Sequence, residues 1–283
     1  MKKLLIVDAF GLIFRAYYAL IKRPLSTREG FPTSAIFGFW KMLFKSIKDI
    51  EPDEVIIALD SPGPSFRKEM YAAYKANREE APEDLKEQIA YIVSMLERLK
   101  VPHLRQDGLE ADDIIAFLTH KYKEEAARIY ILSSDKDLAQ LVDDKVVLAA
   151  PEKGIAELRI LDSAGVVEKF GVRPPQILDY LALIGDTSDN IPGVKGIGPK
   201  TAVGLLQSYG NLDEIYGHLE EIKSESVRKK LSEGKESAFL SLELVRLKTD
   251  LKNLPDFIPG QVVHSENWAL LEAEFLKLEF KNL

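Results

Sequence analysis

The sequence predicts an α/β fold in which a largely parallel sheet carries helices on both faces. Two observations support this prediction. Four short runs are aliphatic or β-branched at successive positions, as strands buried on both faces are. These runs are residues 4–7, 55–59, 129–132 and 146–149. Longer amphipathic segments with helical spacing lie between them, as at 83–99 and 112–122. Strands that alternate with helices along a chain are typical of α/β domains.

The chain is long enough for one large domain or two small ones, at roughly 150 residues each. Its character changes near residue 176, after which Gly, Pro and helix-like segments dominate. The only later strand-like run is 261–264. We therefore expect an α/β domain over residues 1–175 and a helical region over residues 176–283.

The net charge of −7, from 38 Lys and Arg against 45 Asp and Glu, gives no overall sign of nucleic-acid binding. Any DNA contact must therefore come from local basic patches. The absence of Cys excludes disulfides, thiolate nucleophiles, zinc–thiolate sites and iron–sulfur clusters. The first apolar run stops at Asp8, too early for an export signal, and no run approaches the about 18 residues of a membrane span. We expect a cytoplasmic protein with no membrane partner.

Acidic residues follow three of the predicted strands directly. Asp8 and Asp60 end the first two, and Asp135 follows the third, with Asp137 two residues later. In an open parallel sheet, sites form in the crevice outside the carboxyl ends of the strands. A single Asp in this position often caps the next helix instead. Three strands that deliver acids to one edge favour a shared site.

Two further acidic groups strengthen this prediction. Glu110, Asp112 and Asp113 precede an apolar helix, where acids in the first turn are also ordinary partners of the helix dipole. Asp186 and Asp189 are three residues apart, so on one helical turn they would face the same way. The nine candidate metal ligands are Asp8, Asp60, Glu110, Asp112, Asp113, Asp135, Asp137, Asp186 and Asp189.

Acids that converge in this number need counter-charges. Two like charges about 4 Å apart repel by roughly 4 kcal/mol at an effective dielectric constant of about 20. Some carboxylates must therefore bind protons, or divalent cations must neutralise them. Oxygen ligands without Cys or His favour Mg²⁺ or Mn²⁺ over zinc. Such metals suit phosphoryl chemistry, so the acids alone indicate a metal-dependent phosphodiesterase or phosphatase.

A basic and aromatic segment follows the second strand. Arg67, Tyr71, Tyr74, Lys75 and Arg78 are spaced to lie on one face of a helix. Cations beside stackable rings suit a nucleic-acid strand, because the cations meet phosphates and the rings stack on bases. An equally weighted alternative is a solvated helix face whose Tyr side chains pack on the core.

A glycine-rich segment from residue 190 to 206 carries the third motif. It nearly matches a phosphate-binding P-loop, but Pro199 interrupts the motif and no buried strand precedes it. A helix–hairpin–helix fits better, with a turn at 196–198, Pro199 at the first helical position and a helix that ends near Gly210. Backbone N–H groups there could hold a DNA phosphate, although an ordinary turn between packed helices is the alternative. The candidate DNA-binding residues are Gly193, Lys195, Gly196, Gly198, Lys200 and Thr201.

Taken together, these motifs resemble the 5′–3′ exonuclease (flap endonuclease) domain found at the N-terminus of bacterial DNA polymerase I. The resemblance runs from residue 5 to about 210, and residues 278–281 are similar to the end of that domain. The motifs that carry it are residues 7–8 with 14–16, 59–60, 74–78, 108–113, 134–137, and 185–190 continuing into 193–202. Small departures, such as Ala9 where Gly is common, remove no candidate ligand.

The resemblance implies a mixed, largely parallel sheet with helices on both faces, a helical arch near residues 62–95, and a helix–three-turn–helix module that grips duplex DNA. It also implies a divalent-metal-dependent 5′–3′ exonuclease and 5′-flap endonuclease of the bacterial cytosol or nucleoid, acting in replication and repair. The substrates would be DNA with a 5′ flap, a nick or a 5′ end. The chain would be fused to a DNA polymerase or would work with one.

Residue roles also follow from the resemblance. Lys75 and Arg78 would contact the scissile phosphate, Tyr74 would stack on a base, and Arg15 would lie near the 5′ strand. A potassium ion would bind carbonyls of the hairpin at 193–198. Asp8, Asp60, Glu110, Asp112 and Asp113 would hold or neighbour the first of at least two Mg²⁺ or Mn²⁺ ions, and Asp135, Asp137, Asp186 and Asp189 would serve the second.

Two other function classes are less well supported by the sequence. A protein that binds branched DNA without cutting it would not need the full acidic set. An RNA-cutting enzyme on a related sheet is disfavoured by the predicted duplex-gripping hairpin.

Overall fold

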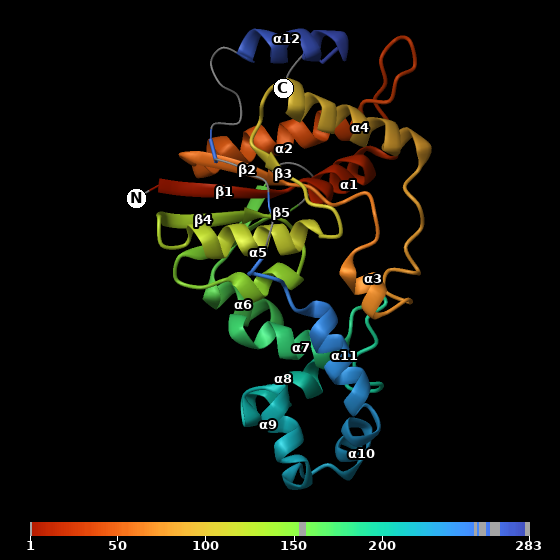
Figure 1. Ribbon diagram of the computed structural model, residues 1–283, viewed down its shortest axis with the longest axis vertical. Coiled ribbons are helices and arrows are strands. Elements are labelled where there is room, and N and C mark those ends of the chain that lie inside the picture. The colour runs from red at the N-terminus through yellow and green to blue at the C-terminus, as the bar shows by residue number, and fades with distance from the viewer. Residues whose placement is uncertain (1, 153–156, 252–253, 255–258, 261–266, 281–283) are drawn as a thin grey trace.

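A six-stranded mixed sheet forms the centre of the molecule in the computed structural model, with strand order β3-β2-β1-β4-β5-β6 (Figure 1). The structure describes residues 2–152, 157–251, 254, 259–260 and 267–280. All neighbouring strands pair in parallel except β5 and β6, which are antiparallel. The strands are β1 (Lys2–Asp8), β2 (Glu54–Ala58), β3 (His103–Leu104), β4 (Ala126–Leu132), β5 (Val146–Glu152) and β6 (Glu157–Leu161). The predicted mixed, largely parallel sheet is confirmed.

Side chains of β1 alternate between two hydrophobic clusters, one on each face of the sheet. Leu5 and Val7 pack with the helices of one face, and Leu4 and Ile6 pack with those of the other. This explains why the strands are aliphatic at successive positions. Figure 1 shows α2 and α4 on one side of the sheet and α5 and α6 on the other. The helices nearest the sheet are α1 (Ala9–Leu20), α2 (Ser34–Ile50), α4 (Glu83–Arg98), α5 (Ala111–Tyr122) and α6 (Ser163–Phe170).

A helical module extends from the α5 side of the sheet, at the lower end of the molecule in Figure 1. Its hydrophobic residues belong to the same cluster as those of α5: Leu118 of α5, Leu181 of α7 and Leu242 of α11 are all members. The interior is therefore continuous from the sheet into the module. The module contains α7 (Ile177–Ile184), α8 (Pro199–Tyr209), α9 (Leu212–Gly217), α10 (Glu225–Glu233) and α11 (Lys235–Val245). The described chain also has 3₁₀ turns at η1 (Asp137–Leu141), η2 (Pro174–Gln176) and η3 (Leu219–Glu221).

The position of the last described helix, α12 (Trp268–Lys277), differs from our prediction that residues 176–283 form one helical region. It packs against α2, on the opposite side of the sheet from the module (Figure 1). The ring of Trp268 stacks on Phe44, and Phe275 lies edge-on to Trp40. The aromatic surface of α2 thus selects this position. The strand-like run predicted at 261–264 lies outside the described residues.

Within the described parts of the chain, no helix combines the length and the apolar character needed to cross a membrane.

The α12 packing predicts a contrast between two leucines of that helix. Leu271 is 1% exposed and Leu276 is 75% exposed. Leu271→Ala should lower the free energy of unfolding by about 3 kcal/mol, because it leaves a cavity in the core. Leu276→Ala should change it by less than about 0.5 kcal/mol. Denaturant unfolding of both variants tests this, and equal effects would contradict the packing described here.

Candidate active site at the carboxyl edge of the sheet

Acidic residues from three strands meet in a cleft at the carboxyl edge of the sheet. Asp8 ends β1, and Asp60 and Asp135 follow β2 and β4 closely. The cleft has a volume of about 560 Å³, and its lining also includes Glu110 and Asp112. A second hollow of about 300 Å³ shares Asp8 and Asp135 with the cleft. Its other lining residues include Lys136, Asp186 and Ser188. The structure therefore brings the strand-end acids together, as the sequence predicts.

Two strand-end acids also accept backbone N–H groups at helix starts, and Asp8 is the N-cap of α1. One carboxylate oxygen of Asp8 accepts the N–H of Gly11 at 2.8 Å, in the first turn of α1. Asp60 likewise accepts the N–H of Ala111 at 2.9 Å, at the start of α5. The second oxygen of Asp8 accepts the hydroxyl of Ser133 at 2.7 Å. The capping alternative and the shared-site prediction thus both describe Asp8, whereas Asp60 does not cap the helix that follows it. In both residues the backbone hydrogen bond fixes where the carboxylate points.

Burial and mutual repulsion make several of these acids hard to ionise. Burial raises the pKa of Asp8 to about 6, and the charges of Asp60 and Asp135 add to the rise. Burial, followed by the neighbouring carboxylates, raises the pKa of Asp112 and Asp137 well above the ordinary value. The pKa values of Asp60 and Asp135 are raised for the same first reason. Bound cations would therefore stabilise the ionised form of the carboxylates in the cleft.

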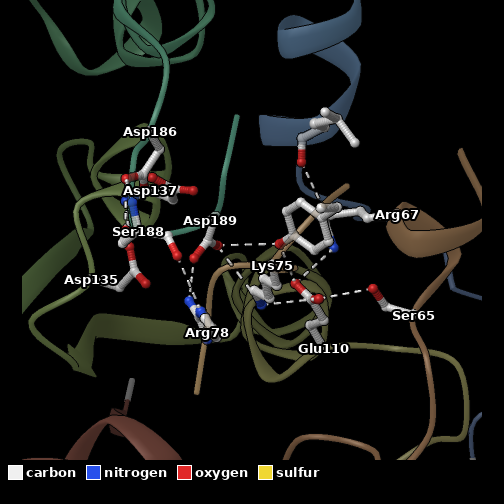
Figure 2. A network of polar contacts seen from close by, with 12 residues as sticks. Ser65, Arg67, Lys75, Arg78, Glu110, Asp135, Asp137, Asp186, Ser188 and Asp189 are labelled. Atoms are coloured by element: carbon white, nitrogen blue, oxygen red, sulfur yellow. Dashed lines mark hydrogen bonds and ion pairs between the residues drawn. The ribbon is translucent and has the colours of Figure 1, made fainter. Parts of the chain in front are cut away.

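Three basic side chains supply part of that charge, and Figure 2 shows two of them, Lys75 and Arg78. Lys75 Nζ lies 3.0 Å from Glu110 Oε1 and 3.8 Å from an oxygen of Asp189. Arg78 forms an ion pair with Asp189 as well. Burial opposes ionisation of Glu110, but the charges of Lys75 and Arg67 outweigh it and lower the pKa of this carboxyl.

Lys136 is the third cation, and it lies at the second hollow. Its Nζ is 3.1 Å from Asp186 Oδ1. Burial opposes the ionisation of Asp186, but hydrogen bonds from Ser188 and the charge of Lys136 lower the pKa of its carboxyl below the ordinary value. The acids thus divide into two groups, those with a cationic partner and those whose neighbours are mainly other acids.

The donor set fits hard divalent cations. All the candidate ligands are carboxylate oxygens, which Mg²⁺ and Mn²⁺ prefer. Asp137 Oδ1 is buried and has no hydrogen-bond partner in the described chain, which leaves it free to bind a cation. Among the described residues, no three acidic side chains are drawn together into a ready-made cage. Repulsion between them, and pairing with Lys75, Arg78 and Lys136, account for this spacing.

Asp113 and Arg67 do not face the cleft, contrary to the metal-ligand prediction for Asp113 and the DNA-contact prediction for Arg67. Asp113 is fully buried, and Arg67 is 2% exposed. The two form a bidentate ion pair, with donor–acceptor distances of 2.6 and 2.9 Å. Neighbouring residues on a helix point about 100° apart, since 3.6 residues make one turn, so Asp112 lines the cleft while Asp113 points into the core.

The predicted basic helix face is not formed, because α3 (Phe66–Met70) ends before Tyr71. Lys75 has a left-handed backbone, with φ of 54°, and its N–H donates to the carbonyl of Asp189 at 2.9 Å. Asn190 donates to the carbonyl of Ala73 at 2.7 Å. These bonds to the 186–190 loop replace those of a continued helix. Local spacing could not show this, because the bonds join segments more than a hundred residues apart.

The two tyrosines of this segment follow the alternative of packing on the core. Tyr71 is half-buried against the hydrophobic cluster, and Tyr74 is 3% exposed. The Tyr74 hydroxyl lies 3.0 Å from Glu110 Oε2 and 3.3 Å from Asp189 Oδ2, so it donates into the acidic cleft.

Asp186 and Asp189 lie in a closed loop instead of on a helical turn. Backbone hydrogen bonds of 2.9 and 2.8 Å join Asp186 and Ile191 in both directions. The two carboxylates consequently reach different partners, with Asp186 near Ser188 and Asp189 near Arg78 (Figure 2).

The predicted hairpin and helix start are present. Gly193 and Gly196 have φ values of 60° and 82°, which favour glycine, and Gly198 precedes Pro199 at the start of α8. A Cβ on Gly193 would lie 2.3 Å from the backbone nitrogen of Gly185, so only glycine fits there. Lys195 and Lys200 are exposed and Thr201 is half-buried. The turn geometry is confirmed, whereas phosphate binding stays a prediction.

Two family models cover most of the chain. The 5′–3′ exonuclease N-terminal resolvase-like domain matches residues 3–171, and the 5′–3′ exonuclease C-terminal SAM fold matches residues 172–259. The chain belongs to the 5′–3′ exonuclease family. It is therefore a DNA nuclease, and the resemblance seen in its motifs is confirmed.

Individual relatives agree with this assignment. The 5′–3′ exonuclease of Aquifex aeolicus is 42% identical over 251 residues, which cover 89% of this chain and 83% of the relative. The thermostable DNA polymerase I of Thermus thermophilus is 40% identical over 281 residues, which cover 99% of this chain and 32% of the polymerase. This nuclease chain thus spans about a third of that polymerase.

Solved structures of similar proteins share the fold. One is the bacteriophage T5 5′-exonuclease with bound divalent metal ions (zinc), with a TM-score of 0.71, 25% identity, and 87% and 90% of the two chains covered. Another is a pseudo-enzyme–product complex of the bacteriophage T5 flap endonuclease with DNA and metal ions, with a TM-score of 0.70, 25% identity, and 86% and 88% covered.

Several residues of the nuclease site were missed by sequence reasoning. Ser133 and Lys136 lie within two residues of Asp135, so their position at a recognised motif was an available signal. Ser65 donates its hydroxyl to Glu110 at 2.8 Å (Figure 2), and nothing in the local sequence marks it. Arg15, by contrast, was predicted from the sequence, and it lies on α1 next to Phe14, which lines the cleft.

The raised pKa of Asp8 predicts how the metal-free nuclease responds to pH. A carboxyl whose folded pKa, about 6, exceeds its ordinary value of 3.8 binds more protons in the folded state between these values. The free energy of unfolding therefore falls as pH rises through this range and stays lower above it. Asp8→Asn should remove the loss while its amide oxygen still accepts from Gly11. In EDTA at neutral pH, we expect this variant to be stabilised by up to about 3 kcal/mol.

Asp162→Asn is the matched control for that measurement. Asp162 caps α6 by accepting the N–H of Gly165 at 2.9 Å, as Asp8 does for α1, but it is exposed and lies outside the cleft. Thermal unfolding with EDTA should show stabilisation for Asp8→Asn alone. Equal behaviour of the two variants would show that Asp8 is not under electrostatic strain.

Proposed function

We propose that this nuclease is a divalent-metal-dependent 5′–3′ exonuclease and 5′-flap endonuclease, which hydrolyses DNA phosphodiesters at junctions between single strand and duplex. The observation that carries the proposal is the acidic cleft, in which buried carboxylates with raised pKa values lie beside Lys75 and Arg78. The T5 flap endonuclease, whose fold this chain shares, was crystallised with DNA and metal ions. A site for metals and a phosphate between acids and bases suits phosphodiester hydrolysis.

Two groups of acids would hold the metals, Mg²⁺ being the expected ion and Mn²⁺ a substitute. Asp8, Asp60, Glu110 and Asp112 line the cleft and would serve the first site. The second site would use Asp135, Asp137, Asp186 and Asp189. Bound there, divalent ions would favour ionisation of an attacking water and stabilise charge on the leaving oxygen. Asp113 is excluded from the first group because its carboxylate is committed to Arg67.

Basic side chains would bind and orient the phosphate, and one hydroxyl would position the acids beside them. Lys75 and Arg78 line the cleft and are ion-paired with Glu110 and Asp189. Since divalent ions would take over the carboxylates, these cations would become available for the scissile phosphate. The hydroxyl of Tyr74 lies between the same two acids and would hold them in place. Arg15, on α1, would lie towards the 5′ strand.

The hairpin and the first turn of α8 would hold the duplex. Lys195 and Lys200 are exposed at this helix start, where backbone N–H groups favour a phosphate. Such contacts position DNA without reading its sequence. A potassium ion on the hairpin carbonyls would have to compete with protein donors, because Lys230 Nζ donates to the Gly196 carbonyl at 3.2 Å and Ser237 to that of Gly193 at 2.6 Å.

The proposed partners are DNA molecules with a 5′ flap, a nick or a 5′ end, in the bacterial cytosol or nucleoid. The similarity to DNA polymerase I supports work alongside, or fusion to, a polymerase, as in that relative. The sequence left open a protein that binds branched DNA without cutting it, and membership of the exonuclease family argues against that alternative. A nuclease and a protein that only binds DNA differ in whether the acidic residues are needed for cleavage as well as for binding.

A 5′-flap DNA with a label at its 5′ end tests the proposal. With Mg²⁺, we expect release of the flap as a discrete oligonucleotide cut at the junction, because the hairpin and cleft hold the substrate at fixed points. With EDTA, no product should form. Tight junction binding without cleavage in Mg²⁺ or Mn²⁺ would favour the binding protein instead.

Substitution of the second acidic group separates cutting from binding. Asp135→Ala and Asp186→Ala should each lower the cleavage rate by about 100-fold or more, since each removes a ligand that supports charge stabilisation. DNA binding, measured by fluorescence anisotropy in Ca²⁺, should be unchanged or tighter because negative charge is lost. Asp162→Ala is the control outside the cleft. Near-normal cleavage by both cleft variants would overturn the metal assignment.

A further inference from the structure

Each nitrogen of the Arg67 guanidinium donates to an acceptor within the protein. Its Nε donates to the carbonyl of Leu244 at 2.7 Å, and its Nη2 donates to the carbonyl of Arg246 at 2.9 Å. Its two Nη atoms bind Asp113 in a bidentate pair, and Nη1 also lies 3.3 Å from Glu110 Oε2. A side chain that is only 2% exposed and has these partners cannot also reach DNA. Its role must therefore be internal.

The partners of Arg67 come from separate parts of the chain. Glu110 and Asp113 lie at the start of α5, beside the acidic cleft. Leu244 and Arg246 lie at the end of α11, where backbone carbonyls lack partners within the helix and the helix dipole is negative. Arg67 thus closes the end of α11 against the start of α5 (Figure 2). Asp113 adds a second tie, because its Oδ1 accepts the N–H of Lys248 at 3.0 Å.

The middle of α11 is fastened to the predicted DNA-binding hairpin. The backbone N–H of Gly193 donates to the hydroxyl of Ser241 at 3.0 Å, and the Gly193 carbonyl accepts the hydroxyl of Ser237 at 2.6 Å. Ser241 is fully buried, so this fastening lies inside the protein. One helix of 11 residues, about 16 Å long, therefore connects the hairpin to the acidic cleft.

We propose that α11, anchored by Arg67 and Asp113 at one end and by Ser237 and Ser241 along its length, is a strut that sets which phosphodiester of the bound DNA reaches the cleft. Arg67 and Asp113 are then positioning residues, and this inference rests on the proposed flap-cutting function. If the hairpin holds a phosphate of the duplex, a fixed distance from hairpin to cleft fixes the number of nucleotides between that contact and the cut.

The chemistry of the anchor requires arginine. Only a planar fork can bind a carboxylate through two N–H groups and still donate to carbonyls on its other edges. Lysine would keep the positive charge beside Asp113 and Glu110 but could not hold both carbonyls of α11 at the same time. Arg67→Lys should therefore loosen the strut while leaving the local charge unchanged.

Cut-site mapping on the labelled 5′-flap DNA tests the strut. Wild-type protein should give one main product. Arg67→Lys should spread the cut over neighbouring phosphodiesters and lower kcat by about 10- to 100-fold, because a reacting phosphate displaced by about 1 Å reacts far more slowly. KM and the affinity for DNA in Ca²⁺ should stay within about 2-fold, since no phosphate contact is lost. Ser237→Ala combined with Ser241→Ala should spread the cut in the same way from the hairpin end.

Arg98→Lys is the matched control, because Arg98 also pairs with a buried carboxylate, that of Glu274 at 3.0 Å, but on α4 and α12. It should leave the cut position unchanged. A single unchanged product from both strut variants would overturn the inference, as would a higher KM for Arg67→Lys with an unchanged cut position, which indicates direct DNA contact. If wild-type protein did not cut the flap at all, the proposed function would fail first, and the two failures are thus distinguishable.

Discussion

Repulsion among carboxylates at one edge of the sheet is the constraint on which the rest of the site depends. The sheet is buried on both faces, so Asp8, Asp60 and Asp135 cannot move apart to relieve it. Backbone N–H groups and the hydroxyl of Ser133 stabilise single oxygens, and Lys75, Arg78 and Lys136 neutralise others. The negative charge that these groups do not neutralise remains available to bind divalent cations and, through them, the substrate. The stability of the site and its chemistry therefore depend on the same charges.

Asp112 and Asp113 show how one helix turn separates function from architecture. Asp112 faces the cleft, where burial, and after it the neighbouring acids, raise its pKa. Asp113 faces the core and binds Arg67. An ion pair buried in this way is costly to break, about 3–5 kcal/mol when one partner is removed, because the other charge is then left unpaired. The same short segment therefore supplies a ligand candidate to the site and a structural anchor beneath it.

Much of the fold and the acidic set could be predicted because the signals were local. Aliphatic runs marked β1, β2, β4 and β5, and acids at strand ends marked the cleft. Contacts between distant segments could not be predicted in this way. The path of the chain at Lys75 depends on the loop at 186–190. The position of α12 depends on the aromatic face of α2, and the burial of Arg67 depends on carbonyls far along the chain. From helical spacing alone, Arg67 and Lys75 were predicted to lie together on one DNA-binding face of a helix.

The hydrophobic interior that runs from the sheet into the helical module has a further consequence. Ile114 and Leu118 of α5 share one cluster with Leu183, Leu205 and Leu242 of the module. Separate family models describe residues 3–171 and 172–259, but separating these two parts would expose the apolar surface of this cluster to water. Because the two parts share one interior, we expect them to unfold together, and we expect a module transplanted from a relative to need its packing surface transferred with it.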